Sequence, residues 1–146
     1  MSQSEENLTP MSHSAQNRCF GCGEANESGL RLEFLLAPDG SVVSLPTVSE
    51  TFEGHPGILH GGIIATLLDE AMSKAVRARG RPSMTFHMEV EFLRPVPSRT
   101  QLRLEGRVVR SDARRHSTEA KIVDSGGVVL AQATGIFVEI RADRRD

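Results

Sequence analysis

The sequence HPGILHGGIIATLLDEAM, residues 55–72, changes from a loop into a helix at its paired glycines. After Gly62 the apolar residues recur every three or four positions, which is the period of an amphipathic helix. The pattern predicts a helix from about Gly62 to Arg79, ended by the sequence RGRPS. One wide face of this helix is apolar and needs a sheet to cover it; it consists of Ile63, Ile64, Leu67, Leu68, Ala71, Met72, Ala75 and Val76.

Two adjacent carboxylates interrupt this apolar run. Glu70 lies on the polar face with Lys74 four residues later, the spacing of an ordinary surface ion pair. Asp69 lies at the edge between the polar and apolar faces, and no cation on its own helix is placed to neutralise it. An unpaired carboxylate beside apolar surface suits a general base or a nucleophile, although an Asp that simply points into water fits the pattern equally well.

The paired glycines stand at the start of this helix. A helix N-terminus presents free N–H groups, and glycine lets a ligand approach the backbone, so Gly61 and Gly62 predict an anion or oxyanion site. A tight entry into a packed helix is the alternative. Asp69 lies further along by a rise of roughly 10–12 Å, more than its side chain can bridge. The two features share a site only if a second copy lies alongside in the opposite direction, as a two-fold axis arranges.

The rest of the chain predicts strands. Residues 30–36 and 41–52 precede the helix and are separated by the turn sequence APDG. Alternating side chains in MTFHMEVEFL (84–93) predict a strand after it, followed by strands at 100–111, 116–123 and 128–140, the last two joined by the hairpin sequence DSGG. The order β-β-α-β-β-β-β predicts an α+β fold, a curved antiparallel sheet wrapped around one long central helix, with a partner covering the remaining surface.

Composition bounds the class of protein. The 146 residues are 38% hydrophobic and 25% charged, which is typical of one globular domain. We expect a flexible tail at 1–17, a folded domain at 18–140 and a charged tail at 141–146. The net charge of −2 gives no signal for nucleic acid, and no apolar stretch is long enough to cross a membrane. Two cysteines make no extracellular disulfide framework, so we expect a cytoplasmic protein.

The pair Cys19-x-x-Cys22 raises the question of a metal site. A structural zinc site takes four ligands, and the sequence has no second cysteine pair. His13 lies in the predicted tail and His116 on a distant strand. We therefore expect a packed N-terminal turn, with no metal and no other cofactor.

Three segments together resemble one family. LHGGIIATLLDEAM resembles the HGG…D signature of PaaI-type acyl-CoA thioesterases, in the hot-dog-fold 4-hydroxybenzoyl-CoA thioesterase superfamily. CFGCGEANESGLRLEF resembles the opening segment of one branch of that group, and MTFHMEVEFLRPV resembles its strand after the helix. The resemblance covers residues 18–140. It implies a hot-dog fold and hydrolysis of an acyl- or aryl-CoA thioester without a cofactor, by a homodimer or a dimer of dimers.

The resemblance also implies roles for single residues. His60 would order the site near the thioester, and the N–H of Gly61 would polarise the thioester carbonyl, with Gly62 beside it. Asp69 of the opposing subunit would act as general base or nucleophile, and Thr85 would orient the water or the carboxylate.

One position departs from the family pattern. Several members carry Asn or Gln where this chain has Gly54, and the neighbouring His55 is the candidate to substitute for that amide. The departure keeps a second function open, a non-catalytic hot-dog protein that binds acyl-CoA. A hot-dog dehydratase is a weaker third reading, because its usual Asp/His arrangement is missing.

Arginines supply candidates for binding the phosphates of coenzyme A by forked contacts. They lie in RSDARRH (110–116) and before Pro95, and we single out Arg94, Arg110, Arg114 and Arg115. For any single one of them a solvated surface position is an equally good reading.

Overall fold

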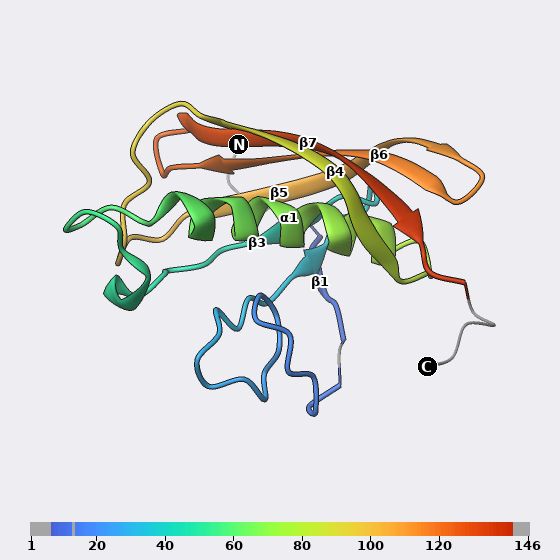
Figure 1. The fold of residues 1–146 in the computed structure, drawn as a ribbon, viewed down its shortest axis with the longest axis horizontal. Helices are drawn as coiled ribbons and strands as arrows, with labels where there is room; N and C mark the ends of the chain where they lie inside the picture. Colours follow the sequence, from blue (N-terminus) through green and yellow to red (C-terminus); the bar gives the residue numbers. More distant parts are fainter. Residues whose placement is uncertain (1–6, 13, 142–146) are drawn as a thin grey trace.

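The computed structural model describes residues 7–12 and 14–141. One helix, α1 (Gly61–Arg77), packs against a seven-stranded antiparallel sheet with the order β1-β2-β3-β5-β6-β7-β4. Figure 1 shows α1 lying along one face of this sheet, with β4 passing beside it. The strands are β1 (Thr9–Pro10), β2 (Leu35–Leu36), β3 (Val42–Ser44), β4 (Ser83–Phe92), β5 (Arg103–Asp112), β6 (Arg115–Val123) and β7 (Val129–Glu139). The predicted α+β arrangement of one long helix against a large antiparallel sheet is confirmed.

Helix α1 begins one residue earlier and ends two residues earlier than predicted. It begins at Gly61 because His60, in an extended conformation, is the N-cap, and the His60 Nδ1 accepts a hydrogen bond from the Gly62 N–H. It ends at Arg77, and Gly80 follows with a φ of +103°, a backbone conformation that glycine adopts without strain.

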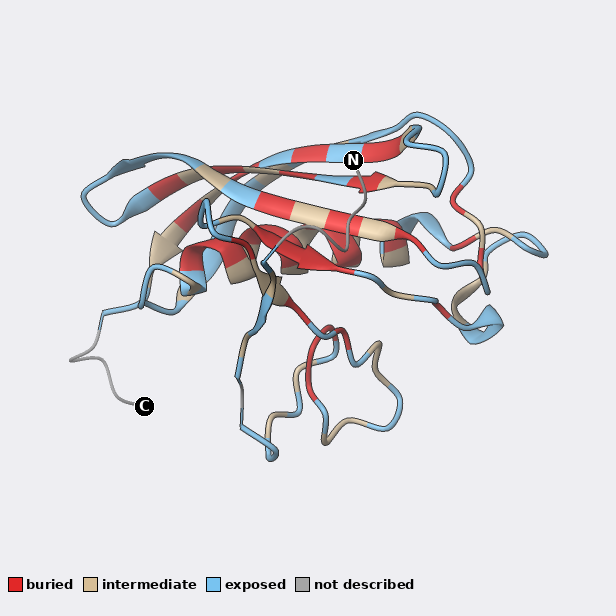
Figure 2. Cartoon of the chain, turned by 180° about the vertical axis from the view of Figure 1, so that it is seen from behind, coloured by how far each residue is buried: buried red, intermediate tan, exposed pale blue. Residues whose placement is uncertain are grey.

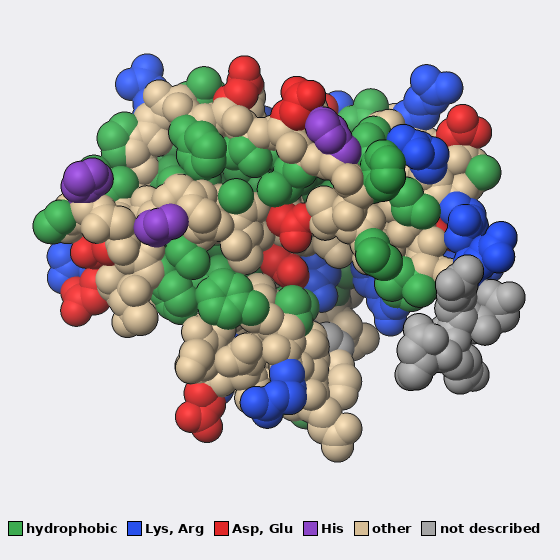
Figure 3. Space-filling model, in the orientation of Figure 1, with side chains coloured by type: hydrophobic (Ala, Val, Ile, Leu, Met, Phe, Trp, Pro, Cys, Tyr) green, Lys and Arg blue, Asp and Glu red, His purple; other side chains and the backbone are tan. Residues whose placement is uncertain are grey.

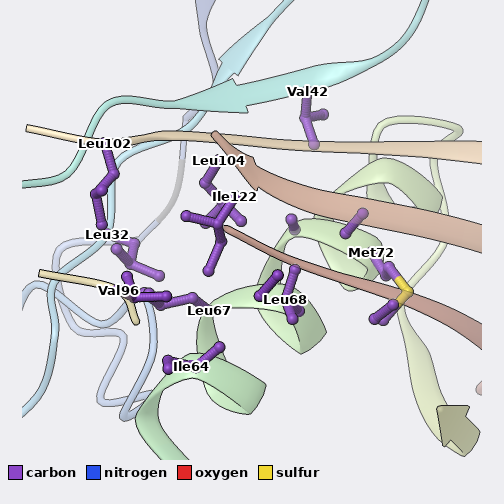
Figure 4. Packing of buried hydrophobic residues seen from close by; sticks show 14 of the residues in the cluster. Leu32, Val42, Ile64, Leu67, Leu68, Met72, Val96, Leu102, Leu104 and Ile122 are labelled. Atoms are coloured by element: carbon purple, nitrogen blue, oxygen red, sulfur yellow. The ribbon is translucent and has the colours of Figure 1, made fainter. Parts of the chain in front are cut away.

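The apolar face of α1 is buried as predicted, with Ile63 half-buried at its margin. Figure 4 shows Leu67 and Leu68 of α1 below Leu104 and Ile122 of the sheet, with Met72 further along the helix. Each fully buried Leu contributes roughly 1.5–3 kcal/mol to the free energy of folding. Helix and sheet approach closely at one glycine: a Cβ at Gly106 of β5 would collide with the backbone carbonyl of Ala71. That contact fixes the axial position of α1 against the sheet.

The long strands lie close to their predicted ranges, because period-two patterns report a half-buried strand directly. The DSGG hairpin is also confirmed, since the Gly127 N–H donates to the Asp124 carbonyl at 3.0 Å and Gly127 has a φ of +85°. Figure 2 shows the result, with buried and exposed positions alternating along the strands.

The two strands predicted before the helix are much shorter than expected. Of residues 30–36 only Leu35 and Leu36 pair in the sheet, because the N–H groups of Leu30 and Leu32 donate instead to the carbonyls of Phe20 and Gly21 in an N-terminal loop. Of residues 41–52 only 42–44 form a strand. Ser49 then caps a 3-10 helix, η2 (Glu50–Phe52).

The N-terminal segment contributes to the sheet within its described part. Thr9 and Pro10 pair with β2, and Met11 packs against the core, inside the range predicted as a tail. Residues 1–6 and 142–146 of the predicted tails, together with His13, lie outside the described residues. The division of the chain at residues 18 and 141 stays a prediction.

Strand β4 forms one edge of the sheet and carries exposed hydrophobic side chains. Met84 and Phe86 are 63% and 65% exposed, and Phe92 is 56% exposed. Figure 3 shows hydrophobic side chains at the surface along the course of β4. Among the described residues, no helix has the length and apolar character needed to span a bilayer.

Candidate active site

The structure brings Asp69 and Thr85 together. Asp69 is half-buried on α1, at the border of its buried face, and Thr85 lies on β4 beside it. The Thr85 hydroxyl donates to Asp69 Oδ1 at 2.6 Å, a short charge-assisted hydrogen bond that fixes the carboxylate and leaves Oδ2 to other partners. Asp69 therefore has a defined orientation, whereas an Asp that merely points into water would have none.

The helix start carries one free donor. The Gly62 N–H is taken by the His60 Nδ1 at 2.9 Å, so a neutral His60 ring carries its proton on Nε2. The Gly61 N–H donates to no acceptor among the described residues. A Cβ at Gly61 would meet the Phe92 ring at 3.7 Å, an ordinary contact. Gly61 thus offers an unused N–H at the positive end of α1, the arrangement that stabilises an oxyanion.

A tight loop leads into this helix start and is held by Glu53. The Ser98 hydroxyl donates to Glu53 Oε2 at 2.5 Å, and this bond, followed by one from the Gly57 N–H, holds the pKa of Glu53 below its ordinary value. Ile58 bridges to Pro97. These contacts tie the loop to residues 96–98 and so fix where α1 begins.

Gly54 and His55 lie in this loop. A Cβ at Gly54 would lie 3.3 Å from the His60 Cα, so the loop passes directly against the N-cap residue. The imidazole of His55 is exposed and makes no hydrogen bond within the part of the chain that the structure describes. Its substitution for the missing amide stays a prediction.

The four candidate arginines lie at two ends of β4 and its neighbours. Arg110, Arg114 and Arg115 belong to the β5–β6 hairpin, where Arg115 pairs with Val138 of β7 and lies 4.9 Å above the Phe86 ring. Arg94 follows β4 at the other end, and its N–H donates to the Leu130 carbonyl. The strand between these ends rises by roughly 25 Å, so one chain does not gather all four around one phosphate group.

The interpretation of Glu70 as a residue of an open surface is wrong. An N-terminal loop covers it: the Cys19 thiol donates to Glu70 Oε2 at 3.5 Å, and Gly21 leaves no room for a Cβ against the Glu70 side chain. Burial raises the pKa of Glu70, which Lys74 partly offsets. Two glycines within CFGCG are the sequence signal for such a close approach, although they do not say which element is approached.

A second cluster that the sequence did not indicate closes the β5–β6 hairpin. The His116 ring is buried, with its Nδ1 2.7 Å from the Ser111 hydroxyl and its Nε2 2.7 Å from Glu139 Oε2. This chain of hydrogen bonds ties the hairpin to the end of β7.

A hollow of about 600 Å³ is lined by outward-facing side chains of the sheet such as Glu89, Glu105 and Lys121. These alternate with the residues that face α1. None of the predicted site residues lines it.

Comparison with known proteins identifies the family. A family model described as the thioesterase superfamily matches residues 56–131, which include His60, Asp69 and Thr85. The chain belongs to the thioesterase superfamily. The resemblance inferred from the HGG…D segment is therefore confirmed.

The relatives of this thioesterase superfamily chain include "Acyl-coenzyme A thioesterase THEM4" of Bos taurus. It is 30% identical over 123 residues, which cover 81% of this chain and 50% of the relative. The chain thus spans about half the length of the curated relatives it matches.

Solved structures agree on the fold. A crystal structure of a thioesterase superfamily protein superimposes with a TM-score of 0.77 at 29% identity, over 85% of this chain and 60% of the other. The PaaI protein of E. coli, from the phenylacetic acid degradation operon, gives 0.71 at 21% identity, over 77% and 81%. A Bacillus halodurans protein solved with CoA gives 0.69 at 27% identity, over 77% and 76%. The chain has the hot-dog fold that these structures share.

Proposed function

We propose that the protein is an acyl-CoA thioesterase that hydrolyses an acyl- or aryl-CoA to the free acid and CoA. One observation carries the proposal: the helix has both an oriented carboxylate, Asp69 held by Thr85, and an unused N–H on Gly61. Both lie on the helix of a thioesterase superfamily domain. The names of the relatives and the CoA bound to the Bacillus halodurans protein support the substrate class.

The site needs two copies of the chain. Asp69 contacts Thr85 near one end of β4, whereas Gly61 lies close to Phe92 at its other end. Antiparallel pairing of two β4 strands about a point between Met88 and Glu89 would place Thr85 of one copy opposite the partner's Phe92. The partner's Gly61 would then meet Asp69, and the two-fold axis would create two equal sites.

The β4 edge suits this pairing. An edge strand presents unpaired N–H and C=O groups, and a ten-residue edge with exposed Met84, Phe86 and Phe92 is unusual unless a partner covers it. The same pairing would bring the partner's Arg94 to the end that holds the β5–β6 hairpin. In the dimer, the arginines of the β5–β6 hairpin and the partner's Arg94 would then lie on either side of one CoA molecule and make forked contacts to its phosphates.

The chemistry follows from these positions. Asp69 takes a proton from a water whose oxygen attacks the thioester carbonyl carbon, and the Gly61 N–H and helix dipole stabilise the oxyanion. Collapse of this tetrahedral intermediate breaks the C–S bond, and the proton passes to the CoA thiolate. If Asp69 attacks directly, an acyl-aspartyl anhydride forms with release of CoA and is then hydrolysed by water.

Mixed dimers test the shared site. Gly61→Pro removes the N–H, and the helix start tolerates it because proline suits the first helical position and His60 is already extended with ψ 140°. Alone, Asp69→Ala and Gly61→Pro should each lose roughly 100-fold or more in kcat. Refolded together in equal amounts, they should recover about one quarter of wild-type activity, because half the dimers are mixed and each has one intact site.

Two controls make the result decisive. Gly61→Ala keeps the N–H, fits the space at Gly61, and should retain activity. A chain carrying both Asp69→Ala and Gly61→Pro, mixed with wild type, should form inactive mixed dimers. Failure of the single variants to complement each other, with dimers confirmed by light scattering, would rule out the shared site.

A non-catalytic acyl-CoA-binding protein is the second candidate, favoured by Gly54, which supplies no amide side chain. CoA release from a panel of acyl- and aryl-CoAs separates the two functions. Tight binding without turnover by the wild type, across the panel, would favour the binding protein.

A further inference from the structure

Three metal-ligating side chains meet on the outer side of α1. The two Sγ atoms of Cys19 and Cys22 and a carboxylate oxygen of Glu70 all lie within 4.8 Å of one another. Glu70 belongs to the middle of α1, whereas the thiols come from a loop about fifty residues earlier in the chain. The grouping is therefore a tertiary feature that local sequence does not produce.

The loop that carries the thiols is held in place by its own hydrogen bonds. The Gly23 N–H donates to the Cys19 carbonyl at 2.7 Å, and the Cys19 N–H donates to Asn17 Oδ1 at 3.0 Å. The amide of Asn17 also donates to the Cys22 Sγ at 3.3 Å. The Cys22 sulfur thus already receives the kind of outer hydrogen bond that orients a metal-bound thiolate.

Charge in this cluster is poorly balanced. Burial raises the pKa of Cys22, and the neighbouring Glu70 raises it further. Burial likewise raises the pKa of Glu70, to which Asp69 adds a smaller upward effect. Lys74 is the cation that acts on both groups, and it acts against these shifts. Two thiolates and a carboxylate in this space would exceed its single charge, and a divalent cation would neutralise them.

We propose that Cys19, Cys22 and Glu70 form a binding site for a thiophilic divalent cation of the zinc class. Two thiolates and one carboxylate are three ligands of the types that zinc takes, and water completes a tetrahedron in sites with three protein ligands. Binding expels the two thiol protons to solvent and displaces the Lys74 ammonium from the Cys22 sulfur. Because the half-buried Cys19 lies toward solvent and Cys22 lies inside, the ion enters from the Cys19 side.

The ion would clamp the N-terminal loop onto α1. Its ligands adjoin Asp69 but face away from Thr85, so the bound ion takes no part in the thioester chemistry. The inference does not rest on the proposed function, and its test does not use activity.

The test titrates the full-length, chelator-treated protein with Co²⁺ and then Zn²⁺ under a non-thiol reductant. The wild type should bind one equivalent of Co²⁺ with a thiolate-to-metal charge-transfer band and the intense visible bands of four-coordinate cobalt, and Zn²⁺ should displace it. Cys19→Ser and Cys22→Ser should each weaken Zn²⁺ binding by roughly a hundredfold or more and lower the charge-transfer band at saturating Co²⁺ to about half, because each leaves one thiolate. Glu70→Gln should keep the band and weaken Zn²⁺ binding.

Thiol reactivity gives a second readout in the wild-type chain. Saturating Zn²⁺ should slow the reaction of both thiols with a disulfide reagent and should raise the melting temperature. Circular dichroism of each metal-free variant confirms that it is folded. A folded wild type that shows no charge-transfer band at millimolar Co²⁺, or binding that the cysteine variants leave unchanged, would overturn the proposal.

Discussion

The hydroxyl of Thr85 donates a 2.6 Å hydrogen bond to Asp69 Oδ1, so an edge strand sets the direction in which a helix carboxylate points. One Asp69 oxygen is thereby occupied, which leaves the other to meet a water or a thioester carbon. The relationship links the packing of β4 beside α1 to the proposed chemistry.

Replacing Thr85 by Val keeps the shape of the side chain and removes this bond. We expect kcat to fall by roughly 10- to 100-fold, as for the loss of a hydrogen bond worth about 1–3 kcal/mol to a charged group, with little change in KM. Steady-state CoA release measures both constants. Thr85→Ser keeps the hydroxyl and should retain most of the rate; a Val variant as fast as the wild type would remove Thr85 from the mechanism.

Replacing Ser98 by Ala removes the largest cause of the low pKa of Glu53. The pKa of Glu53 should rise toward its ordinary value of 4.5, as carbon-13 NMR of the carboxyl group can measure. A carboxyl group whose pKa is lowered by folding stabilises the folded protein at pH values above its ordinary pKa. This contribution is lost as the pH falls through the folded-state pKa. Wild type and variant should therefore differ in stability at neutral pH and converge in acid; an unchanged titration of Glu53 would contradict this assignment.

Replacing Glu70 by Gln should raise the stability of the metal-free protein at neutral pH. A carboxyl whose pKa is raised by folding costs stability once the pH exceeds its unfolded value, because the folded protein must then ionise it against burial. The gain from Gln should shrink as the pH falls through the raised pKa of Glu70 toward its ordinary value of 4.5. Thermal unfolding across this range measures it, and a destabilised Gln variant at neutral pH would refute the account.

Replacing Phe86 by Asp places a charge on the exposed apolar edge of the sheet. In the proposed pairing of β4 strands, position 86 lies opposite the partner's Glu91, so the change adds repulsion to the loss of apolar contact. We expect a monomer by light scattering and loss of turnover together. Val109→Asp changes a residue of comparable exposure on an inner strand and should leave the dimer intact; a fully active Phe86→Asp monomer would exclude the two-chain site.

The sequence was informative where one period governs a long segment. The buried face of α1 and the four long strands after it follow from spacing alone. In a helix, side chains three or four positions apart share a face, and in a strand, side chains two positions apart do. The prediction of a strand over all of 30–36 was wrong because N–H groups in this segment donate to the carbonyls of Phe20 and Gly21. Those carbonyls belong to a loop whose sequence has no period that would reveal the contact.

The candidate site divides in the same way. The helix pattern placed Asp69 at the edge of the apolar face and Gly61 at the free N–H groups, while Thr85 came only from the family resemblance. The surroundings of Glu70 were missed, because the covering loop lies about fifty residues away and the spacing to Lys74 predicted a solvated pair.

Adjacent positions on α1 differ by a turn of 100°, and this sends Asp69 toward β4 and Glu70 toward the cysteine loop. Deleting one residue between Gly61 and Asp69 would move Glu70 to the position beside β4 and would move Asp69 to the buried position that Leu68 now holds. The interval is thus constrained in phase as well as in chemistry. Changes in chain length can accumulate in the turns of this protein, whereas the first half of its helix cannot gain or lose a residue without redirecting both acids.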